Sequence, residues 1–183
     1  MSKMNPIHRT VLGALFVALC VVLPIAFHSI PDAGSILLPM HIPVLVCGLI
    51  CGWPYGFICG LLGPALSCLL TGMPPMVILP AMMVECAAYG AVAGLVLKFV
   101  RTKNMTADLY IALIAAMIAG RVVSGIAKAL IFTPGITMTA WVTASFITAL
   151  PGIVVQLVLI PQVVRLLMKS QSLPTGEARR ARF

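Results

Sequence analysis

Six apolar runs, separated by short breaks of glycine, proline or charge, constrain this sequence more than any other feature. A helix needs about 20 apolar residues to cross the hydrocarbon core of a bilayer, and most of the runs reach or approach that length. Only 9% of the residues are charged and 61% are hydrophobic, whereas a soluble domain carries about 25% charged residues. We therefore predict an all-α integral membrane protein, a bundle of six transmembrane helices.

The predicted spans form a single domain that is followed by a basic tail. The approximate spans are residues 10–27, 40–52, 55–71, 75–99, 107–131 and 141–168, and the tail covers residues 169–183. The second span is short and carries His41 and Pro43 near its start, so five spans with a re-entrant segment are the alternative. The first run is long and lacks a cleavage pattern, so we expect it to be retained rather than removed as a signal peptide.

The basic residues predict the orientation of the bundle, because cytoplasmic loops collect Lys and Arg. They gather before the first run, between the fourth and fifth, and after the sixth: Lys3, Arg9, Lys98, Arg101, Lys103, Arg165, Lys169, Arg179, Arg180 and Arg182. The three opposite connections contain no Lys or Arg. Both termini are therefore predicted to be cytoplasmic, in a cell membrane, and the net charge of +8 reflects topology rather than nucleic-acid binding.

Small residues recur at a spacing of four, which lets helix backbones approach closely in a membrane. They are Ala14 and Ala18; Gly48, Gly52, Gly56 and Gly60; Gly90 and Gly94; and Ala112, Ala116, Gly120 and Ser124. Packing within the chain explains most of these stripes, but Ala14 and Ala18 suit a partner subunit equally well. The six cysteines lie inside apolar runs, where we expect buried thiols and neither disulfides nor a metal site.

Ionisable groups at membrane depth are costly, so they normally face a partner or a wet cavity. Glu85 and Arg121 lie at similar depth on neighbouring helices, at about 15 Å from the outer end at 1.5 Å per residue, and we predict that they form an ion pair. The pair either only fixes helix docking or also lines a ligand pocket. Lys128 follows on nearly the same helix face as Arg121, and either lines that pocket or snorkels to the interface.

Gln156 lies in the middle of the last span, where its amide bonds either to a neighbouring helix or to a ligand. Further polar residues fall on the side predicted to be outer: His28, Asp32, Ser35 and His41 lie in or beside the first connection, and Trp141 follows the last connection. Trp141 also suits a purely interfacial anchor. Their shared side indicates a polar cavity that opens outward.

The sequence lacks the residues that several classes of membrane protein require. No HExxH motif and no GxSxG motif occurs, and the four acidic residues are scattered, which argues against an intramembrane protease or a metal-dependent phosphotransferase. Autonomous secondary transporters are commonly larger and built from two related halves, and we find no internal repeat. An autonomous permease remains the alternative to a small substrate-binding membrane subunit that obtains energy from its partners.

Several segments together resemble the substrate-binding S components of energy-coupling factor (ECF) vitamin transporters. They are the Ala14 and Ala18 pair, residues 37–43 (LLPMHIP) leading into Cys47 and Gly48, residues 52–56 (GWPYG) and residues 72–75 (GMPP). The resemblance covers nearly the whole chain.

The resemblance implies a high-affinity subunit of an ABC-type importer for a vitamin or vitamin precursor, with pantothenate, a pyridoxine-type vitamin and cobalamin left open. It implies no cofactor and no catalysis, a transmembrane coupling subunit that contacts Ala14 and Ala18, and two cytoplasmic ATPases. The gate would include His28, Asp32 and Ser35. The substrate-binding candidates are then Glu85, Arg121, Lys128, Gln156, His41 and Trp141.

Overall fold

The computed structural model describes residues 5–26, 36–100, 102, 104–129 and 137–172, and this part of the chain is helical without a strand. The long helices are α1 (Pro6–Ala26), α4 (Trp53–Thr71), α5 (Leu79–Phe99), α6 (Met105–Ala127) and α8 (Leu150–Ser172). The shorter ones are α3 (His41–Cys51), α7 (Met138–Val142) and a π-helix, η2 (Thr143–Thr148).

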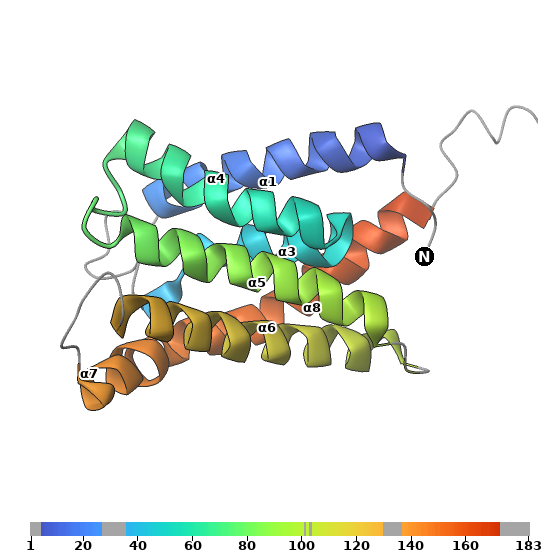
Figure 1. Cartoon of the computed structure of the whole chain (residues 1–183). Coiled ribbons are helices and arrows are strands. Elements are labelled where there is room, and N and C mark those ends of the chain that lie inside the picture. Colours follow the sequence, from blue (N-terminus) through green and yellow to red (C-terminus); the bar gives the residue numbers. More distant parts are fainter. Residues whose placement is uncertain (1–4, 27–35, 101, 103, 130–136, 173–183) are drawn as a thin grey trace, which may run out of the picture.

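The long helices run side by side, with α1 against α4, α4 against α5 and α5 against α6 (Figure 1). The short helix α3 occupies the middle, where it contacts α1, α4, α5, α6 and α8. α1 begins and α8 ends at the same end of the bundle (Figure 1), which we call the terminal end. α4 and α6 end, and α3 and α5 begin, at the opposite end, which we call the distal end (Figure 1).

Five helices are long and apolar enough to cross a membrane: α1, α4, α5, α6 and the Leu150–Lys169 part of α8. α3 has 11 residues, or about 16 Å at 1.5 Å per residue, whereas the hydrocarbon core is about 30 Å thick. The prediction of an all-α membrane bundle is confirmed. The count of six spans is not, because the second predicted span is too short to cross as a helix by itself.

Two glycines in the left-handed region make the turns at the two ends of α4. Gly52, with φ of 98°, joins α3 to α4, and Pro54 follows in the first turn of α4, where a missing N–H does no harm. Gly72, with φ of 72°, caps the other end and donates its N–H to the Cys68 carbonyl. Both turns fall where the sequence predicted breaks, because glycine enters this region without a steric cost.

Glycines form the contact between α3, α4 and α5. A Cβ added at Gly56 would lie 2.6 Å from the Gly48 Cα, and one at Gly94 would lie 2.7 Å from the Trp53 Cα. Gly60 and Gly90 also face the backbone of a neighbouring helix. The predicted packing role of these glycines is confirmed, since any side chain would force the helices apart.

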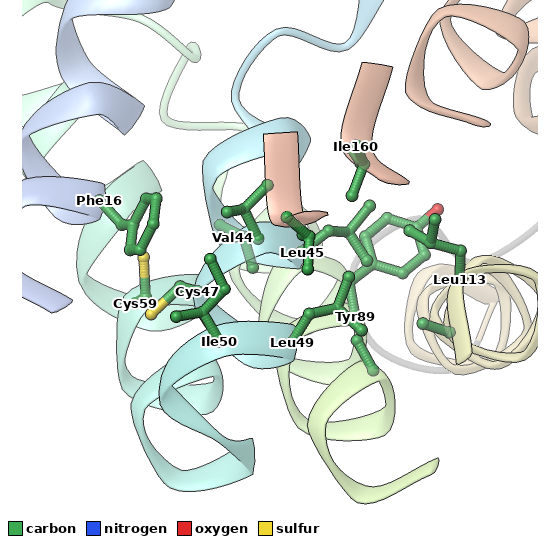
Figure 2. Packing of buried hydrophobic residues seen from close by; sticks show 14 of the residues in the cluster. Phe16, Val44, Leu45, Cys47, Leu49, Ile50, Cys59, Tyr89, Leu113 and Ile160 are labelled. Carbon is green, nitrogen blue, oxygen red and sulfur yellow. The ribbon is translucent and has the colours of Figure 1, made fainter. Parts of the chain in front are cut away.

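The apolar core surrounds α3, and Figure 2 shows its side chains meeting those of the other helices. Leu45 and Leu49 of α3 lie close to Tyr89 of α5, while Phe16 of α1 lies on the other side of α3. All six cysteines are buried and free, as expected for thiols used as small apolar side chains.

Candidate functional site

Polar side chains from four helices collect toward the distal end of the bundle. They are His41 at the start of α3, Glu85 and Tyr89 in α5, Arg121, Ser124 and Lys128 at the end of α6, and Gln156 in α8. In an antiparallel bundle, the start of one helix lies beside the end of the next. The first residues of α3 and α5 therefore lie near the last residues of α6, although these segments are far apart in the sequence. We call this set the polar cluster.

The Glu85 carboxylate is the centre of the polar cluster. Its Oε1 accepts a hydrogen bond from the Tyr89 hydroxyl at 3.1 Å, and its Oε2 accepts one from the Ser124 hydroxyl at 2.9 Å. The Lys128 Nζ lies 3.8 Å from Oε2, and the His41 Nε2 lies 3.9 Å from Oε1. One partly buried carboxylate therefore ties α3, α5 and α6 together.

Arg121 does not make the ion pair that the sequence predicted for it. Among the described residues, Lys128 is the lysine or arginine whose charged group lies within 4 Å of the Glu85 carboxylate. The Arg121 guanidinium carbon instead lies 5.8 Å from the centre of the Tyr89 ring and 5.5 Å from that of Phe146. Both distances suit cation–π contacts, and Arg121 is buried, with 3% of its surface exposed.

The difference follows from the antiparallel packing of α5 and α6. Tyr89 lies one turn deeper in α5 than Glu85, and Arg121 lies correspondingly deeper in α6 than Ser124. Arg121 is therefore level with the Tyr89 ring, while Ser124 and Lys128 are level with the carboxylate. The contact of Lys128 with Glu85 directs its amine toward the cluster, and 30% of its side chain is exposed.

Within the part of the chain that the structure describes, several buried polar atoms of predicted site residues have no hydrogen-bond partner: His41 Nδ1 and Nε2, Gln156 Nε2 and Trp141 Nε1. His41 and Gln156 are 2% and 1% exposed. Trp141 packs edge-to-face on Phe146 at 5.9 Å. A Cβ added at Gly125 would lie 2.6 Å from the indole nitrogen of Trp141. An unpaired buried polar group costs about 1–3 kcal/mol, so these atoms destabilise the isolated chain.

Comparison with known proteins assigns the chain to a family. The family model of the ECF transporter substrate-specific component matches residues 8–164. This chain is an ECF S component. The resemblance read from the sequence is confirmed, and with it the assignment to a membrane-embedded, substrate-binding transport subunit rather than an enzyme. No curated protein and no solved structure matches the chain significantly.

Of the six predicted substrate-binding residues of this S component, the structure places His41 and Lys128 within 4 Å of the carboxylate of a third, Glu85. Arg121 is linked to Trp141 through the Phe146 ring, which both of them contact. Gln156 is buried within α8, which contacts both α3 and α6. The predicted gate residues His28, Asp32 and Ser35 lie outside the described residues.

The sequence analysis missed the role of three site residues, Tyr89, Ser124 and Phe146. Tyr89 lies four residues after Glu85, and Ser124 lies four residues before Lys128, so both share a helix face with a charged residue. That spacing was a usable signal for both. Phe146 belongs to the π-helix η2, whose irregular twist no spacing argument predicts.

The predicted partner residues Ala14 and Ala18 lie on the exposed side of α1. Ile7, Val11, Val22 and Ile25, which continue the same stripe at spacings of three and four, are between 53% and 71% exposed. The two smallest side chains of this exposed apolar stripe, Ala14 and Ala18, therefore lie at its middle.

Proposed function

We propose that this S component captures a vitamin or vitamin precursor at the polar cluster and passes it to an importer. A separate coupling subunit and two cytoplasmic ATPases would provide the energy, in a prokaryotic plasma membrane. The observation that carries the proposal is the set of buried polar atoms of His41, Gln156 and Trp141 that lack a hydrogen-bond partner among the described residues, in a chain that belongs to a substrate-binding family.

The hydrogen-bond donors of the predicted site residues favour a ligand rich in acceptors, such as a carboxylate. The Gln156 and Trp141 nitrogens that lack a partner among the described residues are donors, and the Lys128 amine adds a partly exposed cation. The rings of Tyr89, Phe146 and Trp141 would cover an apolar or aromatic part of the same molecule. Pantothenate, a pyridoxine-type vitamin and cobalamin are all retained as candidates.

The distribution of cations supports an outward-facing site. Arg9, Lys98, Arg165 and Lys169 all lie toward the terminal end of the bundle, which by the positive-inside rule is the cytoplasmic end. The polar cluster lies toward the distal end, so a substrate from outside the cell would reach it first. On the family resemblance, the segment that contains His28, Asp32 and Ser35 is proposed to gate this entrance.

The proposal is tested by purifying the chain alone and identifying the small molecule that co-purifies by mass spectrometry, followed by titration of that compound. Gln156→Leu should weaken its binding about tenfold, because a buried amide that pairs with the ligand contributes about 1–2 kcal/mol. Gln162→Leu, at an exposed position of the same helix, is the matched control and should bind normally. Absence of any bound vitamin-like compound, or equal affinities for the two variants, would count against the site.

The exposed stripe of α1 is proposed as the surface that contacts the coupling subunit. Ala14 and Ala18 are small and exposed, and close helix approach in a membrane depends on small residues. The same residues are not needed for packing within the described part of the bundle, since they face away from it. Their proposed role is therefore assembly, separate from substrate binding.

A further inference from the structure

A second polar feature lies at the terminal end, remote from the polar cluster. A half-open cavity of about 340 Å³ is bounded by the first turns of α1, the turn between α3 and α4, and the last turns of α5. Its polar and aromatic lining consists of Arg9, Cys51, Trp53, Tyr55 and Lys98, and Leu49, Ile50 and Leu97 add apolar wall. We call it the terminal cavity.

The described lining of the terminal cavity carries positive charge without an acidic counterpart. Two cations, Arg9 and Lys98, belong to it, and no Asp or Glu is among the lining residues that the structure describes. The Arg9 Nε is buried and has no hydrogen-bond partner in the described residues. A partly desolvated guanidinium with a partnerless donor is unfavourable unless an anion approaches it.

Helix electrostatics explain Lys98 but not Arg9. Lys98 lies in the last turn of α5, where a cation is favoured by the helix dipole. Arg9 lies in the first turns of α1, where a cation opposes the dipole. The positive-inside rule accounts for a basic residue at this end, but not for the burial of its Nε inside a cavity. Binding of an anion accounts for both the position and the burial.

The other lining residues indicate which kind of anion fits. Trp53 is 42% exposed at the start of α4, and exposed tryptophan at a helix end is typical of the level of lipid head groups. α4 begins there without a side-chain cap, so its first N–H groups add positive partial charge. The apolar wall formed by Leu49, Ile50 and Leu97 suits the glycerol and upper acyl part of a lipid rather than a fully hydrated ion.

We propose that the terminal cavity binds the phosphate of an anionic phospholipid, with Arg9 and Lys98 holding the phosphate oxygens and Trp53 lying beside the glycerol. Basic pockets between transmembrane helices are a recognised form of anionic-lipid site. The proposal does not depend on the substrate or on the polar cluster.

The test compares lipids on the purified full-length chain in mixed micelles. Phosphatidylglycerol should raise the melting temperature and be retained in native mass spectrometry, while phosphatidylcholine at the same mole fraction should do neither. The Arg9→Gln, Lys98→Gln double variant should lose affinity for phosphatidylglycerol by about tenfold or more, because each cation near a lipid surface contributes about 1 kcal/mol. The single variant Arg9→Lys keeps the charge but loses the guanidinium fork, and a smaller loss is expected.

The matched control is the Arg165→Gln, Lys169→Gln double variant, which removes the same charge from α8 outside the terminal cavity. Phosphatidylglycerol should bind this variant within about twofold of the unmodified chain. An equal loss in both double variants would overturn the proposal in favour of a diffuse surface field. Glycerol phosphate without acyl chains is the second arm. If it stabilises the chain as well as phosphatidylglycerol does, the site takes a soluble phosphate and the lipid assignment is wrong.

Discussion

α1 and α3 lie side by side, yet they differ in length and in how much of their surface is buried. α1 has 21 residues, and only 17% of its most apolar span is buried. α3 has 11 residues, of which only Ile42 is not fully buried. The long helix mostly faces the surroundings of the bundle, whereas the short one touches five other helices and has almost no exposed surface.

The difference shows how helix length and enclosure are linked in a membrane. A helix shorter than the hydrocarbon core ends inside it, and the unpaired backbone groups at its ends cannot face lipid. α3 is therefore tolerated only because protein surrounds it. α1 is long enough to face lipid along its length, so its outer surface is available to a partner, while the start of α3 is available for the polar cluster through His41.

The strongest test of this contrast replaces one glycine in each helix by alanine. Gly48→Ala in α3 places a Cβ against the Gly90 backbone, and neither helix can yield. Gly13→Ala in α1 places its Cβ 3.4 Å from the Tyr55 ring, which a small side-chain shift accommodates. We expect Gly48→Ala to destabilise the chain by about 3 kcal/mol or more, and Gly13→Ala to change stability by less than about 1 kcal/mol.

Thermal unfolding in detergent, followed by size-exclusion chromatography, measures both glycine variants. Equal melting temperatures would contradict the enclosed position of α3, since both substitutions add the same methyl group to a helix interior.

The second test asks whether α1 is held by one face only. Phe16 is 4% exposed and packs toward α3, whereas Leu15, its neighbour in sequence, is 53% exposed. Phe16→Ala should cost about 2–4 kcal/mol through lost packing contacts. Leu15→Ala should cost less than about 0.5 kcal/mol, because lipid replaces the contacts of an outward side chain. The melting temperatures of the two variants give the comparison, and a large effect of Leu15→Ala would show that α1 is buried on two faces.

Much of the bundle could be predicted from local sequence features and from the alternation of helix direction along the chain. The apolar runs predicted the class, and the breaks at Gly52 and Gly72 predicted both turns of α4, because only glycine takes those backbone angles readily. The stripes at spacing four predicted the close contact at Gly56 and Gly90. His41, Glu85 and Lys128 were predicted to share one end because connections alternate between the two ends of a bundle.

What the sequence did not predict depends on tertiary contacts. An apolar run of 13 residues does not reveal whether protein or lipid surrounds it, so the second predicted span was counted with the others. Arg121 and Lys128 share a helix face, and only the relative shift of α5 and α6 decides which of them meets Glu85. The π-helix η2 breaks the regular spacing on which any prediction of Phe146 would rest.

The third test measures how strongly the polar cluster joins α5 to α6 beside the start of α3. Glu85→Gln, Lys128→Met and the double variant form a cycle whose coupling energy we expect to be about 1 kcal/mol. The value is modest because the Lys128 side chain is 30% exposed and solvent screens the pair. Unfolding free energies of the four proteins give the coupling. The control pair is Glu85→Gln with Lys98→Met, which lies toward the terminal end and should be additive. Equal coupling energies in both cycles would show that Glu85 and Lys128 have no specific interaction.

The smallest effect on the isolated chain is expected on the outer face of α1. Ala14→Trp with Ala18→Trp should leave the melting temperature and substrate binding unchanged, because both side chains point away from the bundle. The same double variant should abolish complex formation and uptake if this face docks the coupling subunit, since two indoles prevent close helix approach. Ile114→Trp with Ile118→Trp adds similar bulk at the same spacing on exposed positions of α6 and serves as the control. Normal uptake by the α1 variant would remove the partner-surface assignment, whereas loss of uptake in both variants would show that the assembled transporter resists added bulk on more than one face.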